Sequence, residues 1–349
     1  MEKRIVLWGN NEYTYPGTGT FIPFLTSHIH EDQEVHPAMI VVPGGAFIQL
    51  CSGEAEGVSN AFFKMGYNTF VLVYTNNVTT RHPVYKQAMM DFARAIRILR
   101  RDWKRFGIDP DQIHGIGFSA GGTLTASMAV LWNNPSLAGK GIYQNTSAYL
   151  NSASLVYAKT RWGDDELGIL LNEKRAFRLD DYVSQTSSPM FILHGTEDVM
   201  VPAVENALPM ALASAKAGIP YELHLLLGCG HGFIVKELEE DGPVKSRYLF
   251  EQLYQTLQAM TEGEFEEHRD LYSPLSKNMS YNTFADIVQH IVMNKMWMCG
   301  LKGNAEDIDT AISATTGQQE KEGDIRHPSA AGWWHWVDNW IGQLHAIGK

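Results

Sequence analysis

The chain has 349 residues, of which 44% are hydrophobic and 19% charged, and its formal net charge is −11. This composition is typical of a globular protein, and the acidic excess argues against nucleic acid and anionic membrane surfaces as partners. No apolar stretch is long enough to span a membrane, and the one near the start is too short for a signal peptide. Cys51, Cys229 and Cys299 are far apart, so we expect a cytoplasmic protein with no disulfide framework and no zinc site.

Apolar runs bounded by turn residues predict eight strands along the first two thirds of the chain. They lie at residues 4–8, 20–29, 37–42, 68–74, 113–116, 154–158, 189–195 and 221–227. Helical periodicity predicts helices at residues 54–65, 84–106, 204–217 and 329–347, and a small-residue helix at 123–129. Alternation of this kind predicts a mostly parallel, doubly wound sheet of eight strands with flanking helices. Ligand sites in such sheets lie beyond the carboxyl ends of the strands.

The last third of the chain follows a different pattern. We expect residues 1–235 to form the core, with a small lid at 159–188, and residues 236–325 to form a mainly helical insertion. Two predicted helices could close the core, one at Val244–Met260 and one at Ser329–Ile347. The tryptophans of the second make it the preferred closing helix. Residues 326–349 are therefore predicted to be the closing helix. The insertion either covers the site or mediates a homodimer contact.

A Gly-x-Ser-x-Gly pattern at Gly117–Gly121 lies between a predicted strand and a predicted helix. A serine on so sharp a turn has strained backbone angles, and its neighbours two positions away must be small. Ser119 is therefore a candidate nucleophile. A second feature, Pro43–Ala46, follows the third strand and lacks bulk. Main-chain N–H groups there, together with that of Ala120, would bind an oxyanion.

Two further strand ends carry candidate acid and base groups. Asp198 follows the strand at 189–195, where an aspartate can accept the Nδ1–H of a histidine, and Glu197 is a rival acid. His231 follows the last strand with glycine on both sides, which leaves the imidazole free to act as a base. His327 is the fallback base. The chain order serine, aspartate, histidine is the order that this architecture uses.

These motifs resemble the α/β-hydrolase superfamily over residues 35–235, and most closely its acetyl esterase and hormone-sensitive-lipase-like branch, which includes carbohydrate and xylan deacetylases. The resemblance rests on Val42–Phe47, Gly107–Gly122, His194–Asp198 and Gly230–Phe233. It implies that Ser119, His231 and Asp198 form a catalytic triad and that Gly45, Ala46 and Ala120 form the oxyanion hole. The chain departs from the family at Pro43, where a histidine is frequent, and at Ala46, where a third glycine is usual.

The resemblance implies a serine esterase that hydrolyses small acyl esters, with acetyl groups on sugars or xylo-oligosaccharides as the expected substrates and no cofactor. An arylformamidase-like amidase or a small peptidase would use the same triad. A hydrolase fold that binds a ligand without catalysis is a further alternative. The sequence leaves the substrate open.

Overall fold

The computed structural model describes residues 4–9, 11–16, 20–47, 50–76, 84–137, 141–162, 177–234, 252 and 330–347. Its main element is an eight-stranded sheet in the order β1-β2-β4-β3-β5-β6-β9-β10. The strands are β1 Ile5–Val6, β2 Phe24–His28, β3 His36–Val42, β4 Asn68–Val73, β5 Ile108–Phe118, β6 Ser152–Val156, β9 Met190–Gly195 and β10 Tyr221–Leu226. β2 runs antiparallel to β1 and β4, and the strands from β4 to β10 are parallel. The predicted sheet is confirmed.

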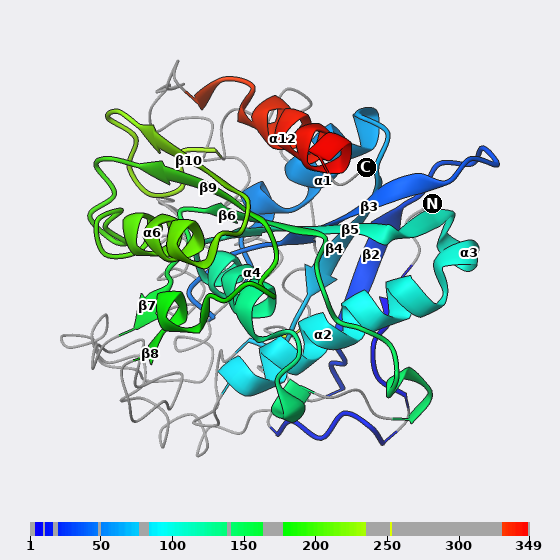
Figure 1. The fold of residues 1–349 in the computed structure, drawn as a ribbon. Helices are drawn as coiled ribbons and strands as arrows, with labels where there is room; N and C mark the ends of the chain where they lie inside the picture. The colour runs from blue at the N-terminus through cyan, green and yellow to red at the C-terminus, as the bar shows by residue number, and fades with distance from the viewer. Residues whose placement is uncertain are drawn as a thin grey trace, which may run out of the picture.

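Helices cover both faces of this sheet (Figure 1). α1 Glu56–Lys64 and α12 Trp333–Ile347 lie on one side, and α2 Tyr85–Arg101, α4 Ser119–Leu131 and α6 Ala207–Ala217 lie on the other. The shorter elements are α3 Trp103–Phe106, the 3₁₀ turns η1 Ser52–Glu54, η2 Pro135–Leu137, η3 Gly141–Tyr143 and η4 Leu179–Tyr182, and the antiparallel pair β7 Arg161–Trp162 and β8 Phe177–Arg178. In the described part of the chain no helix combines the length and the hydrophobicity needed to cross a membrane.

Some predicted boundaries are wrong. The helix expected at 84–106 divides into α2 and α3 at Asp102, and the one expected at 54–65 divides into η1 and α1. β5 begins at Ile108, ahead of the strand predicted at 113–116, and so includes Asp109 and Pro110. Proline is tolerated there because β6 pairs with β5 only from His114 onward and the β3 register shifts beside it, so this end of β5 resembles an edge strand.

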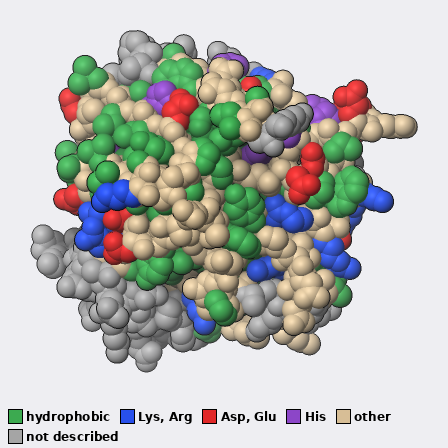
Figure 2. All heavy atoms as spheres, viewed as in Figure 1, with side chains coloured by type: hydrophobic (Ala, Val, Ile, Leu, Met, Phe, Trp, Pro, Cys, Tyr) green, Lys and Arg blue, Asp and Glu red, His purple; other side chains and the backbone are tan. Residues whose placement is uncertain are grey.

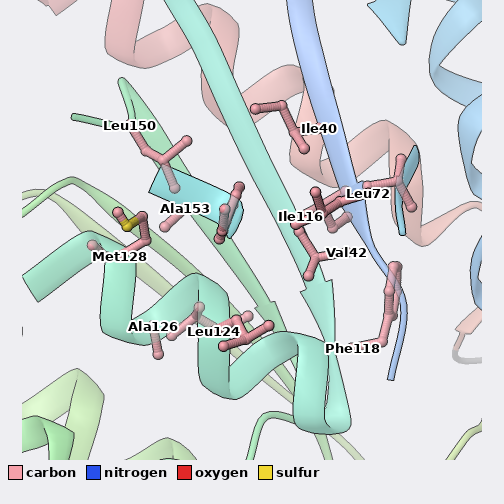
Figure 3. Packing of buried hydrophobic residues seen from close by; sticks show 14 of the residues in the cluster. Ile40, Val42, Leu72, Ile116, Phe118, Leu124, Ala126, Met128, Leu150 and Ala153 are labelled. Atoms are coloured by element: carbon pink, nitrogen blue, oxygen red, sulfur yellow. The ribbon is translucent and has the colours of Figure 1, made fainter. Parts of the chain in front are cut away.

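The core explains why α4 has no charged residue. Eleven of its residues are buried, from Ala120 to Val130, so the helix is enclosed on nearly every side. Leu124 and Met128 are fully enclosed beside the strands (Figure 3). All six residues of β4 are buried as well, as expected of a strand covered on both faces. The site at the end of β5 is therefore built on a rigid, close-packed support.

The tryptophan-rich helix α12 packs on the core. Trp333 is fully buried with its ring centroid 6.0 Å from that of Phe118, and Trp340 lies 5.7 Å from Phe191. Tyr67 donates a 2.8 Å hydrogen bond to Asp338. The rival helix at 244–260 lies outside the described residues apart from position 252, as do most of 236–325 and the middle of 159–188. The division into core, insertion and closing helix stays a prediction.

Candidate active site

Ser119 lies at the junction of β5 and α4, in the strained conformation that its pattern predicts. Its φ is 49°, in the left-handed region that residues with a side chain rarely adopt. The neighbouring chain is very close, since a Cβ on Gly121 would lie 2.0 Å from the carbonyl oxygen of Val42. The requirement for a small residue two positions after the serine therefore has a direct cause, the approach of β3 to the start of α4.

His231 joins Ser119 to Asp198 through two hydrogen bonds. Its Nε2 lies 2.9 Å from Ser119 Oγ, and its Nδ1 lies 2.7 Å from Asp198 Oδ2. Because a carboxylate only accepts, Nδ1 carries the proton and Nε2 is left to accept the serine proton. The histidine side chain is 17% exposed and the aspartate side chain is fully buried. The structure thus brings together three residues that the sequence places on three different strand ends.

Asp198 is held as a carboxylate by its surroundings. Burial opposes its ionisation, but hydrogen bonds from His194, His231 and the main-chain N–H of Val201 outweigh burial and hold the pKa of Asp198 well below its ordinary value. Asp198 therefore faces the imidazole as an anion at neutral pH. Glu197, the rival acid, is exposed and is not the residue that bonds His231. The fallback base His327 lies outside the described residues.

The loop predicted to bind an oxyanion passes directly beside Ser119. A Cβ on Gly44 would lie 2.9 Å from the Cβ of Ser119. Gly45, Ala46 and Phe47 all have positive φ, at 119°, 56° and 59°. Ala120 is the second residue of α4, immediately after the serine, and is 2% exposed. The candidate oxyanion residues Gly45, Ala46 and Ala120 thus flank the nucleophile on two chain segments, and the loop segment is strained.

Two residues that the sequence analysis did not single out adjoin this site. The ring of Tyr157, just after β6, lies 4.9 Å from the ring of His231, and its hydroxyl donates a 2.8 Å hydrogen bond to Glu54. Glu54 also accepts a 2.6 Å hydrogen bond from the N–H of Gly44. In the sequence, Glu54 only begins the stretch predicted to be helical, so no motif indicated this contact.

A second polar cluster lies at the opposite, amino-terminal edge of the sheet. Within the described ranges, His30, Asp32 and His36 form the one group whose potential metal-ligand atoms lie within 4.8 Å of one another. The ring of His36 is already engaged, because Nδ1 lies 2.8 Å from the carbonyl of Gly66 and Nε2 lies 2.9 Å from Asp32. His30 and Asp32 also line a cavity of about 530 Å³. This cluster lies across the sheet from Ser119.

Sequence comparisons find several proteins that are similar to this chain. The BD-FAE family model matches residues 27–158, which include the Gly44–Phe47 loop, Ser119 and Tyr157. The chain is 32% identical to endo-1,4-beta-xylanase B of Butyrivibrio fibrisolvens over 244 residues, 66% of this chain and 37% of that protein. It is 28% identical to esterase LipQ of Mycobacterium tuberculosis over 204 residues, 52% of this chain and 47% of that one. The chain spans between 37% and 55% of the length of the curated relatives that it matches.

Solved structures show the same architecture. An acetyl ester-xyloside bifunctional hydrolase from Caldicellulosiruptor lactoaceticus superposes with a TM-score of 0.58 at 25% identity, covering 74% of this chain and 97% of that one. The carboxylesterase Cest-2923 from Lactobacillus plantarum WCFS1 gives 0.59 at 18% identity, covering 78% and 98%. The fold is that of an α/β-hydrolase. Together with the sequence relatives, it makes the chain similar to esterases and related hydrolases of this fold.

Proposed function

We propose that this protein is a serine carboxylesterase that removes small acyl groups, above all acetyl groups, from carbohydrate esters. The observation that carries the proposal is the unbroken hydrogen-bond chain from Asp198 through His231 to Ser119. A buried anion, an oriented imidazole and a strained serine in this order are what nucleophilic acyl transfer requires.

The reaction uses the proposed roles in sequence. His231 Nε2 takes the proton of Ser119 as Oγ attacks the ester carbonyl carbon, and the carbonyl oxygen becomes an oxyanion facing the amides of Gly45, Ala46 and Ala120. Collapse of this intermediate breaks the bond to the alcohol, and the alcohol departs with the proton from His231. The acyl group remains bonded to Ser119. Water then attacks the acyl-enzyme by the same steps and releases the acid. Asp198 orients the imidazole and stabilises its positive charge throughout.

The choice of acetylated carbohydrates rests on what the similar proteins are. One relative is a xylanase, another an esterase, and one structural neighbour is an acetyl ester-xyloside hydrolase. An ester panel tests the chemistry. With p-nitrophenyl esters from acetate to octanoate, we expect kcat/KM to be highest at acetate. We also expect acetate release from acetylated xylo-oligosaccharides to be faster than hydrolysis of p-nitroacetanilide, the amide counterpart of p-nitrophenyl acetate.

The role of Ser119 is tested in the same assay. Ser119→Ala should lower kcat by about 10⁴-fold or more, since little remains when the nucleophile is lost. Ser136→Ala is the matched control, because Ser136 is exposed in η2 and should leave the rate unchanged. Equal hydrolysis by wild type and Ser119→Ala would show that the esterase proposal is wrong, and faster cleavage of the anilide would favour the amidase alternative.

A further inference from the structure

Glu54 is a buried carboxylate that the proposed mechanism does not use. It ends η1, only 4% of its surface is exposed, and burial raises the pKa of its carboxyl above the ordinary value. Both of its hydrogen bonds come from neutral donors, the N–H of Gly44 and the hydroxyl of Tyr157. Burying a carboxyl group in this way costs free energy, so the two contacts of Glu54 indicate a role for this group.

The first contact reaches the predicted oxyanion loop. Glu54 Oε2 accepts from Gly44 N–H at 2.6 Å, directly before Gly45, Ala46 and Phe47, whose φ values are all positive. A positive φ is unfavourable for a residue with a side chain, so this loop keeps its shape only if its ends are fixed. The carboxylate is one such restraint, and the hydroxyl of Tyr74, which donates to the Pro43 carbonyl at 2.8 Å, is another.

The second contact reaches the catalytic histidine through Tyr157. Tyr157 itself has a φ of 37°, and its hydroxyl donates to Glu54 Oε1 at 2.8 Å. Its ring lies 4.9 Å from the ring of His231 and 6.0 Å from that of Phe118, the residue before the nucleophile. The carboxyl group of Glu54 therefore joins the Gly44–Phe47 loop beside Ser119 to the ring of Tyr157, which lies against the ring of His231.

We propose that Glu54 is a positioning residue, which holds the Gly44–Phe47 loop and Tyr157 in the geometry that the oxyanion and His231 require. The inference rests on the proposed esterase function. Loss of the carboxyl group leaves the Gly44 N–H and the Tyr157 hydroxyl without partners in a buried site, and the strained loop relaxes. The amides of Gly45 and Ala46 then move away from the position where negative charge develops. Because this charge exists only in the transition state, kcat falls and KM changes little.

Three variants separate positioning from general destabilisation. Glu54→Ala should lower kcat on p-nitrophenyl acetate by about 10²–10³-fold, the range for loss of one oxyanion donor, with KM within about threefold of wild type. Glu54→Gln should recover most of this loss, because the amide oxygen accepts from Gly44 while the amide nitrogen donates to the Tyr157 hydroxyl oxygen. The matched control is Glu56→Ala, which removes a carboxyl group of similar burial, 6% exposed, whose ion pair is with His28. It should leave kcat unchanged.

The inhibition constant Ki of phenylboronic acid is a second measurement, and a loss of folding stability alone does not change it. The boronate adds to a serine hydroxyl and becomes tetrahedral, so it mimics the transition state. Measured below the unfolding temperature of every variant, Ki should weaken in Glu54→Ala in parallel with kcat. If Glu54→Ala does not fold, Tyr157→Phe tests the same chain and should lower kcat about tenfold, with Ki moving in parallel.

The outcomes distinguish this inference from the function that it rests on. A kcat for Glu54→Ala equal to that of Glu56→Ala, or a Gln variant as impaired as the Ala variant, would overturn the positioning role. So would a loss of kcat in Tyr157→Phe without a change in Ki. If hydrolysis instead persists in Ser119→Ala, the esterase proposal itself fails.

Discussion

The two edges of the central sheet both gather histidine and carboxyl side chains, but they do so by different means. At the carboxyl edge, Ser119, Asp198 and His231 follow three strands, and His231 and Ser119 are 112 positions apart in the chain. At the amino edge, the cluster of His30, Asp32 and His36 comes from the short loop between β2 and β3 and the start of β3. Acidic and histidine side chains gather where this loop projects from the body (Figure 2).

The difference lies in what each arrangement costs. The carboxyl edge holds Ser119 and Tyr157 at positive φ and buries Asp198 completely, and each of these features opposes folding. At the amino edge, the Asp32 side chain is 46% exposed, and solvent screens its ion pair with His36. Strain and burial maintained by distant parts of the chain are typical of functional sites, whereas a local, solvated cluster is typical of surface structure. Matched substitutions at the two edges test this contrast.

The largest expected effect is the loss of the base. His231→Ala removes the group that takes the serine proton, and we expect kcat on p-nitrophenyl acetate to fall by about 10⁴-fold or more. His36→Ala removes a histidine with two hydrogen bonds at the other edge and should leave kcat within about twofold. Steady-state kinetics of both purified variants provide the measurement. A similar loss in both variants would mean that the two edges do not differ in function.

A smaller effect is expected from the carboxyl groups. Asp198→Asn places an amide where Nδ1–H of His231 needs an acceptor, which disturbs the tautomer, and kcat should fall by about 10³–10⁴-fold. The pKa of Asp198 is held well below its ordinary value, so the wild-type residue stays ionised at any pH where the protein is assayed. Asp32→Asn is the control and should not change the rate. Retention of full activity by Asp198→Asn would exclude Asp198 as the orienting acid.

Local patterns were sufficient to predict the sheet and the strand ends that carry Ser119, Asp198 and His231. Gly117 and Gly121 meet the need for close approach around Ser119, and Gly232 beside His231 has a φ of 75°, so these requirements of the turns are visible in the sequence. The role of Glu54 was not visible in this way. It precedes Glu56 in an apparently helical stretch, and its burial depends on Tyr157, which is 103 positions away. Contacts at that range leave no periodic signal, and the same holds for the left-handed conformation of Tyr157.

The smallest expected effect is the contribution of the His36–Asp32 pair to stability. Partial burial opposes the charge on His36, but hydrogen bonds to Asp32 and to the Gly66 carbonyl raise its pKa above 6.5. The stability from this group is therefore full below pH 6.5 and is lost as pH rises through the raised pKa. The hydrogen bond from His36 lowers the pKa of Asp32 below 3.8, so that contribution is present above pH 3.8 and is lost as pH falls.

Both groups of the pair are charged between these limits, with His30 and Glu34 as the nearest other titratable groups. We expect the thermal midpoint of wild type to exceed that of Asp32→Asn between pH 3.8 and 6.5, and the difference to shrink above that range and at high salt. Thermal unfolding at a series of pH values measures it. A difference that persists unchanged to pH 9 would show that the amino edge is held by something other than a solvated ion pair. The distinction between the two edges would then rest on the activity of His36→Ala alone.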